Sequence, residues 1–284
     1  MILRLFLISF APGIFWLWFF LRQDKIRPEP LRLIALTFLL GCISTLPAGL
    51  GNYLFGANSL LEGSPNFISV VTAMTLVVGP VEELCKFGAV RLGPYRSLYF
   101  DEPVDGLVYA SAASLGFASL ENLFYVWQYG PAVMLLRAPL STVGHLVFGS
   151  IWGYALGQYY ISGRRKRSLL FGSLALSAGA HALFNVLVFS FPLGAVALVI
   201  LGGIWSFRAI RKGDRHSPFR LRRNYPRIIC DSCGASMSTF NSFCTRCGAP
   251  RAEGKSTIVC SNCEKPNRAD AAFCTSCGDQ FLMG

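Results

Sequence analysis

This sequence has few charged residues for its length. Only 14% of its 284 residues are charged, against 53% that are hydrophobic, and the mean hydropathy is +0.47. An ordinary soluble domain carries about 25% charged residues, so this composition excludes a chain made only of such domains. The shortage is uneven: residues 1–210 are long apolar runs with short charged joints, whereas residues 211–284 are polar, basic and rich in cysteine. We therefore predict a membrane domain followed by a small soluble tail.

Seven apolar stretches are long enough to cross a bilayer, which takes about 20 mainly apolar residues. They lie at 2–21, 32–54, 66–90, 104–127, 139–161, 168–190 and 192–209. The first has no small-residue cleavage site after its apolar core, so we interpret it as an anchor and not a signal peptide. The predicted fold class is an all-α polytopic membrane bundle of about seven transmembrane helices, with six to eight compatible with the pattern.

A Gly79-Pro80 pair interrupts the third stretch. Proline removes a helical hydrogen bond and bends the helix axis, so we predict a kink or a re-entrant start at this point. In straight helices, at about 1.5 Å per residue, Glu82 and His181 would lie at depths that differ by about 10 Å. The predicted irregularity would bring them level.

Lys and Arg fall in alternate joints between these stretches. Joints 22–32, 91–103 and 162–167 and the segment that follows residue 207 each hold two to four, whereas the intervening joints hold none or one. Basic loops stay in the cytoplasm. We therefore predict a multi-pass protein of the cell (inner) membrane, with its N-terminus outside and its C-terminal tail in the cytoplasm.

Residues 211–229 carry seven Lys or Arg against one Asp. Such a juxtamembrane linker binds anionic lipid headgroups with about 1 kcal/mol for each basic residue. A signal that only fixes the topology would have the same composition, and the sequence leaves both interpretations open.

Eight of the ten cysteines form two copies of C-x2-C-x10-C-x2-C within residues 230–250 and 258–280. Each C-x-x-C offers two thiolates, and two of them complete a closed tetrahedral zinc site. A disulfide framework is the alternative, but the regular spacing and a reducing cytoplasm favour zinc. We predict two zinc-ribbon modules, each with one structural Zn²⁺. The ligands are Cys230, Cys233, Cys244, Cys247, Cys260, Cys263, Cys274 and Cys277.

The tail is nearly neutral once its metal is counted. From residue 216 onward there are nine basic and five acidic residues, and eight thiolates with two Zn²⁺ add −4. Nucleic-acid-binding modules carry a basic face, so nucleic acid is an unlikely partner. We expect the ribbons to contact a protein, or to be a regulatory or stabilising appendage.

Polar and ionisable side chains recur inside the predicted spans, where each costs several kcal/mol unless it is paired or solvated. Helical spacing places Lys86 on one face with Glu82 and Glu83, and it places His181 one turn from Asn185. Small residues that allow close helix packing accompany them, such as the glycines every fourth residue after His145. We expect the whole set to point inward: Glu82, Glu83, Lys86, Glu121, Asn122, His145, His181 and Asn185.

Four of these segments resemble the motifs of the PrsW proteases, in the same order. Glu82-Glu83-Leu-Cys-Lys86 resembles the EExxK motif, and Gly116-Phe-Ala-Ser-Leu-Glu121-Asn122 resembles the glycine-rich GFA-x-x-EN segment. His145 and His181-Ala-Leu-Phe-Asn185 resemble the two histidine motifs. The match covers about residues 65–190. The family is related more distantly to the CAAX prenyl proteases, and the zinc ribbons are not part of its core pattern.

This resemblance implies an intramembrane endopeptidase that cuts membrane-anchored protein substrates. A motif glutamate, Glu82 or Glu83, would activate water together with His145, while His181 and Asn185 would stabilise the oxyanion. Lys86, Glu121 and Asn122 would support them. In a metalloprotease alternative, two histidines and a glutamate would hold a catalytic zinc. Asn185 suits an oxyanion better than zinc, so we favour the metal-free mechanism. A non-catalytic scaffold or sensor, and less readily a transporter, are the remaining alternatives.

Overall fold

The computed structural model describes residues 2–24, 28–163, 165–215, 227–238, 244, 246–250, 258–260, 262–267, 271 and 273–281. The chain forms two compact units, Met1–Ser217 and Pro218–Gly284. The predicted linker 211–229 falls mostly outside the described residues, so its contact with lipid stays a prediction.

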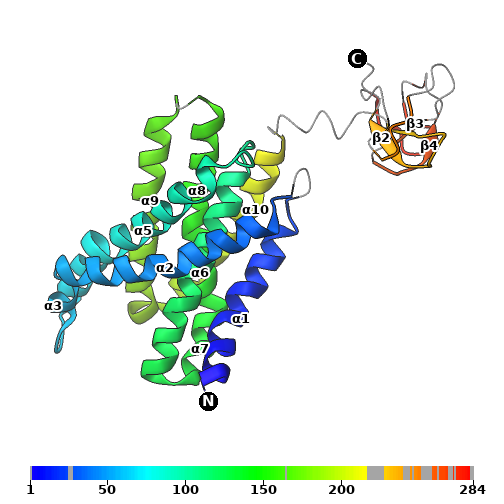
Figure 1. The fold of residues 1–284 in the computed structure, drawn as a ribbon. Helices are drawn as coiled ribbons and strands as arrows, with labels where there is room; N and C mark the ends of the chain where they lie inside the picture. Colours follow the sequence, from blue (N-terminus) through cyan, green and yellow to red (C-terminus); the bar gives the residue numbers. More distant parts are fainter. Residues whose placement is uncertain are drawn as a thin grey trace. The chain divides into compact units, whose positions relative to one another are not determined.

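The first unit is all helical (Figure 1). Its helices are α1 (Ile2–Leu21), α2 (Leu31–Leu54), α3 (Ala57–Leu61), α4 (Phe67–Thr72), α5 (Gly79–Leu92), α6 (Asp105–Tyr129), α7 (Met134–Leu136), α8 (Thr142–Ile161), α9 (Arg167–Ser190) and α10 (Pro192–Arg215). Two π-helical segments, Ala73–Val78 and Arg137–Ser141, lead into α5 and α8, and short 3₁₀ turns lie at Pro94–Arg96 and Pro131–Val133. Every predicted span therefore corresponds to a helical segment.

In the described part of the chain, six helical segments are long and apolar enough to cross a membrane. They are Leu3–Leu21, Leu31–Leu54, Phe67–Arg96, Pro131–Ile161, Arg167–Ser190 and Pro192–Gly213. The remaining predicted span is α6, whose 25 residues reach about 37 Å. Most of α6 is buried against α1, α2 and α8, so its surroundings are protein and it tolerates more polar residues than a lipid-facing helix.

The irregularity predicted at Gly79-Pro80 takes the form of a π-helical segment that ends at Val78 and continues directly into α5. The chain stays helical from Phe67 to Leu92, so the re-entrant alternative is wrong. Gly79 lies against α9: a Cβ there would come within 2.5 Å of the Ala178 carbonyl oxygen. The close approach places the residues after Gly79 beside those after Ala178.

The predicted glycine seam of α8 packs on α6. A Cβ at Gly153 would lie 2.4 Å from the Ala110 Cβ, and one at Gly157 would lie 2.1 Å from the Pro103 carbonyl oxygen. Only glycine permits this backbone approach. The seam therefore brings His145, on the same helix, against α6.

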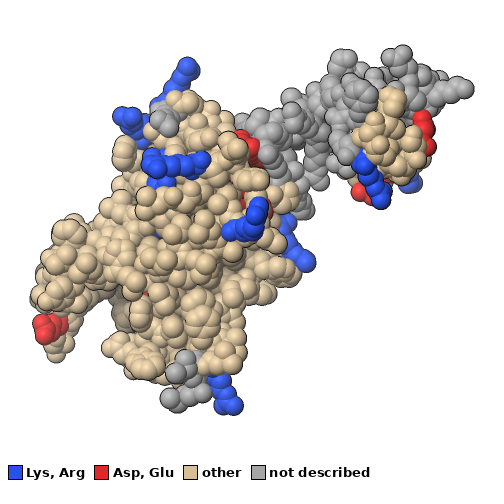
Figure 2. All heavy atoms as spheres, viewed as in Figure 1, with Lys and Arg blue, Asp and Glu red and all other residues tan. Residues whose placement is uncertain are grey.

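Lys and Arg side chains gather at the end of this unit where α8 turns into α9 (Figure 2). The same end receives the C-terminus of α10 and the turn between α1 and α2. This is the arrangement that the alternating joints predicted. Which side of a membrane this end faces stays a prediction.

The second unit contains one four-stranded sheet in the order β2-β1-β3-β4. Its strands are β1 (Arg227–Ile229), β2 (Ser236–Ser238), β3 (Ile258–Val259) and β4 (Pro266–Asn267), all paired antiparallel. Each zinc-ribbon module supplies one hairpin, and the pairing of β1 with β3 joins them, which the cysteine spacing did not predict. Gly234, Gly248 and Gly278 have φ values of 67°, 75° and 73°, as expected after the second cysteine of a C-x-x-C turn.

Candidate active site

Polar side chains from four helices converge inside the first unit. Glu82, Glu83 and Lys86 come from α5, His181 from α9, and His145 and Glu121 from α8 and α6. The His181 Nδ1 atom lies 2.9 Å from Glu83 Oε1, and its Nε2 lies 3.7 Å from Glu82 Oε2. The packing of Gly79 on α9 accounts for this meeting, because Glu82 and Glu83 follow it by one helical turn.

Both oxygens of the Glu83 carboxylate accept hydrogen bonds. Its Oε1 accepts from the Lys86 ammonium at 2.8 Å, and its Oε2 accepts from the Trp152 indole N–H at 3.0 Å and the Ser177 hydroxyl at 3.2 Å. With His181 as a further partner and only 1% of its surface exposed, this carboxylate is fully occupied. It is suited to orienting its neighbours and not to receiving a substrate.

Lys86, His145 and Glu121 form a chain of hydrogen bonds. The Lys86 Nζ lies 2.9 Å from His145 Nδ1, and His145 Nε2 lies 2.9 Å from Glu121 Oε2. A charged ammonium can only donate, so Nδ1 accepts and the Nε2–H donates to Glu121. The ammonium also lies 4.3 Å from the centre of the Phe117 ring, a cation–π contact.

Arg137 is the last member of this chain of hydrogen bonds. From the sequence it was predicted only as a basic residue in the joint between two spans. Its guanidinium donates to Glu121 Oε2 at 2.5 Å and to Asn122 Oδ1 at 2.8 Å. The Asn122 amide also donates to Thr142. Asn122 therefore anchors Arg137, and Glu121 Oε2 lies between the Arg137 guanidinium and the His145 ring, within hydrogen-bond distance of both.

Glu82 differs from Glu83 in having an unused atom. Its Oε2 is buried and has no hydrogen-bond partner among the described residues. Because His181 Nδ1 donates to Glu83, the lone pair of His181 Nε2 faces this oxygen. A buried carboxylate oxygen beside an imidazole lone pair is a place for a water molecule or a cation.

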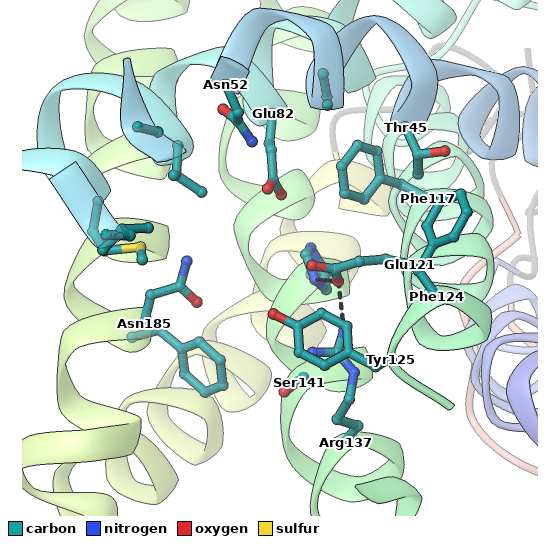
Figure 3. Close-up of a pocket in the computed structure, with 18 of the residues that line it drawn as sticks. Thr45, Asn52, Glu82, Phe117, Glu121, Phe124, Tyr125, Arg137, Ser141 and Asn185 are labelled. Carbon is teal, nitrogen blue, oxygen red and sulfur yellow. Dashed lines mark hydrogen bonds and ion pairs between the residues drawn. The ribbon is translucent and has the colours of Figure 1, made fainter. Parts of the chain in front are cut away.

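Glu82 lies at the wall of a cavity of about 660 Å³ (Figure 3). Glu82, Glu121 and His145 line it, and Asn185 lines it from α9, with its amide entering the space in the close-up. The cavity is bounded by the late residues of α2, α6 and α9, such as Gln128 and Phe189. These are the ends of the helices away from the basic joints.

Glu82, His145 and His181 each offer a ligand atom, and these atoms lie within 4.8 Å of one another. For Glu82 and His181 the fit to a metal ion is good, since an oxygen and a nitrogen lone pair are free to coordinate. For His145 it is poorer, because both ring nitrogens have partners. That ring becomes a ligand only if Lys86 or Glu121 releases it.

The two cysteine clusters fit zinc without such a conflict. Within each of the two sets of four, the Sγ atoms lie within 4.8 Å of one another. Four thiolates with no place for a fifth group make a closed structural site. In the second cluster the Asn267 amide also points to Cys274 Sγ, at 3.4 Å. The ribbons therefore carry structural Zn²⁺.

Sequence reasoning missed two residues of the membrane site, Trp152 and Arg137. A spacing signal was available, because they lie seven residues after and eight residues before His145. About two helical turns return a side chain to the same face. Trp152 was passed over as an apolar residue, and Arg137 as part of a joint.

Known proteins resemble both units. The family described as PrsW family intramembrane metalloprotease matches residues 29–209, and the double zinc ribbon family matches residues 230–278. A Protease PrsW from Geobacillus kaustophilus is 32% identical over 178 residues, which are 63% of this chain and 76% of the relative. For those from Bacillus subtilis and Clostridioides difficile, the identities are 32% over 157 residues (55% and 69%) and 29% over 209 residues (70% and 85%). No solved structure matches the chain.

Proposed function

Because this chain belongs to the PrsW protease family, we propose that it hydrolyses peptide bonds of membrane-anchored proteins at the cavity beneath Glu82. The observation that carries the proposal is the Glu82 Oε2, which has no hydrogen-bond partner among the described residues and lies 3.7 Å from both Lys86 Nζ and His181 Nε2. Glu82 lines a cavity in the membrane unit. Hydrolysis needs a water molecule, a base and an oxyanion donor. The groups around the cavity supply all three.

In the proposed reaction, a water molecule is held by Glu82 Oε2 and His181 Nε2. Its oxygen attacks the carbonyl carbon of the substrate while its proton passes to the Glu82 carboxylate. The Asn185 amide donates to the oxyanion that forms. Glu82 then gives the proton to the amide nitrogen as the C–N bond breaks, which leaves a carboxylic acid and an amine.

In this proposal the two histidines exchange the roles that the family resemblance implied. His181, not His145, has a ring nitrogen that faces Glu82. His145 is held between Lys86 and Glu121. This suits a positioning residue that fixes the Lys86 ammonium near Glu82. Glu83 holds both Lys86 and His181 in place.

A metalloprotease is the second candidate, favoured by the cluster of ligand atoms from Glu82, His145 and His181. These three residues would hold the ion. A bound Zn²⁺ would polarise the carbonyl and activate a water molecule. The metal-free reaction remains our first choice because the two hydrogen bonds of His145 would have to be broken.

The cavity should open toward the outer side of the membrane. Its lining comes from the helix ends remote from the basic joints, and basic joints face the cytoplasm. The same rule puts the zinc ribbons in the cytoplasm, where their closed sites would serve contact with a protein partner. Reporter fusions at residues 62 and 215 test this: the first should be extracytoplasmic and the second cytoplasmic.

The activity is tested with the full-length protein in liposomes and tagged single-span proteins as substrates. Glu82→Gln and His181→Gln should each lower the cleavage rate at least about a thousandfold, since they remove the base or the partner of the water. Glu62→Gln, at an exposed glutamate of the α3–α4 turn, is the matched control. Wild-type cleavage by both site variants would refute the proposal.

Counting zinc separates the two mechanisms. The ribbons account for two Zn²⁺ per full-length chain, so the metal-free site predicts two and the metal site predicts three. If the count is three and His181→Gln lowers it to two, the catalytic metal is established and the metal-free reaction is wrong.

A further inference from the structure

We propose that Asn52 on α2 binds the main chain of an unwound substrate segment next to the scissile bond. This inference rests on the proposed proteolytic function and adds the conformation in which substrate is bound. Asn52 lies outside every motif that the sequence singled out. It enters the cavity beside Glu82 (Figure 3).

One face of α2 forms a wall of the cavity. Thr45, Ala48, Gly49 and Asn52 line it, at the i, i+3, i+4 and i+7 spacing of a helical face. Ala48 and Gly49 are small, and no described atom lies within 4 Å of where a Gly49 Cβ would be. The small side chains of this wall therefore allow another main chain to run close to α2. Asn52 lies at the C-terminal end of the wall.

The Asn52 side chain has an unsatisfied group. Its Oδ1 is buried and has no hydrogen-bond partner within the described residues. A buried polar atom without a hydrogen bond is costly, so its presence on a residue of the cavity wall calls for a partner that arrives with a ligand. Glu82 is the other described residue of the cavity lining that has such an atom.

The substrate has the complementary need. A peptide bond in a membrane-spanning helix must leave the helix before water can attack it, and the N–H and C=O groups so freed find no water in the hydrocarbon. A carboxamide both donates and accepts, so it can pair with a substrate N–H and with a C=O. Asn52 and Asn185 approach the cavity from α2 and α9. Asn52 would hold the main chain of the substrate while Asn185 stabilises the oxyanion.

The substrate class follows from this arrangement. A single-span protein should be cut where its helix unwinds at low cost, at segments containing glycine or β-branched residues, since these have lower helix propensity than leucine or alanine. Recognition would depend on the backbone more than on any one side chain, because the wall of α2 offers small residues and an amide.

Kinetics in liposomes test the role of Asn52. A panel of synthetic single-span peptides, each with a glycine- or valine-containing segment in a leucine helix, serves as substrate. For a peptide that the wild type cuts, Asn52→Leu should raise KM about tenfold, the loss of one hydrogen bond, with little change in kcat. Asn52→Gln should restore part of the binding. Tyr53→Leu, the next residue and 66% exposed, is the control for folding and should be unchanged.

A backbone scan identifies the contact itself. The chosen peptide is made with a single N-methyl group at each position around the scissile bond in turn. At the position whose N–H pairs with Asn52, methylation should lower the cleavage rate of the wild type about tenfold. The same methylation should not lower the rate of Asn52→Leu, which has already lost this hydrogen bond. Losses that multiply at every position, or a wild-type KM for Asn52→Leu, would overturn the inference and leave the protease intact. A failure of the proteolytic function is separate: no peptide is cut, or Glu82→Gln cuts as fast as the wild type.

Discussion

The zinc ribbons and the membrane site gather ligating groups in opposite ways. In each ribbon, four thiolates from a stretch of 18 residues surround one point and complete a shell with no open position. In the membrane site, groups from four helices, up to 99 residues apart, bond mostly to one another. They leave one carboxylate oxygen without a hydrogen bond, on a glutamate that lines a cavity. The first cluster can only stabilise a fold. The second can act on something that enters.

The largest effect is expected where the ribbon shell is broken. Cys244→Ser should lower the zinc content of the full-length chain by one and unfold the first ribbon, because metal binding contributes about 10–16 kcal/mol to the folding of such modules. Metal analysis after gel filtration measures it. Cys85→Ser, at a cysteine of the membrane unit outside both clusters, should leave the zinc count unchanged. An unaltered count in Cys244→Ser would show that the four-thiolate shell is not the zinc site.

Within the membrane site, the two adjacent glutamates should separate stability from activity. Glu83→Leu should lower the free energy of unfolding by about 3–5 kcal/mol, because it leaves the fully buried Lys86 ammonium without its nearest carboxylate. Glu82→Gln should change stability less, since its Oε2 has no hydrogen bond to lose and lies 3.7 Å from Lys86 Nζ, farther than the Glu83 Oε1 at 2.8 Å. Thermal unfolding in detergent compares the two. Equal losses of stability would contradict the division between a holding and a reacting glutamate.

Gly79→Ala tests whether helix packing assembles the site, as local spacing assembles a ribbon. The added methyl would meet the Ala178 carbonyl oxygen at 2.5 Å, so α5 must move away from α9. A shift of about 1 Å between Glu82 and His181 can cost about a hundredfold in rate. Gly172→Ala on α9, where a Cβ meets no described atom within 4 Å, is the control. Full activity in Gly79→Ala would mean that this contact does not set the site.

The same contrast explains what could be predicted from the sequence. The ribbons follow from C-x-x-C spacing because all ligands lie within about 20 residues, and the spans follow from apolar length. The helical faces of Glu82, Lys86 and His181 were also readable, since periodicity is local. Tertiary contacts bring those faces together, namely the π-helical segment before α5 and the packing of Gly79 on α9. The Gly79-Pro80 pair is the only sign of these contacts in the sequence.

The contacts of the charged side chains were predicted less well than the helices that carry them. Arg137 was assigned to a loop because it sits between two apolar stretches, yet the π-helical segment Arg137–Ser141 carries it into the bundle, where it is 9% exposed. The exchange of histidine roles that we propose has a similar origin. Both rings were expected near a glutamate, but the tautomers depend on Lys86 and Glu83, whose contacts are set by packing.

Substitution of Arg137 should have the smallest effect on the cleavage rate. It tests whether the hydrogen bonds from Arg137 through Glu121 to His145 support the reaction without touching the reacting atoms. Arg137→Gln should lower the cleavage rate about ten- to a hundredfold, as expected for a lost charge-assisted hydrogen bond, because Glu121 then holds His145 without the guanidinium behind it. Arg137→Lys should recover only part, since an ammonium lacks the planar fork that reaches Glu121 and Asn122 together. Arg96→Gln, at an exposed arginine, is the control. A positioning role predicts a fall in kcat with an unchanged KM and unchanged zinc content; a rise in KM alone would instead make Arg137 part of the substrate-binding wall.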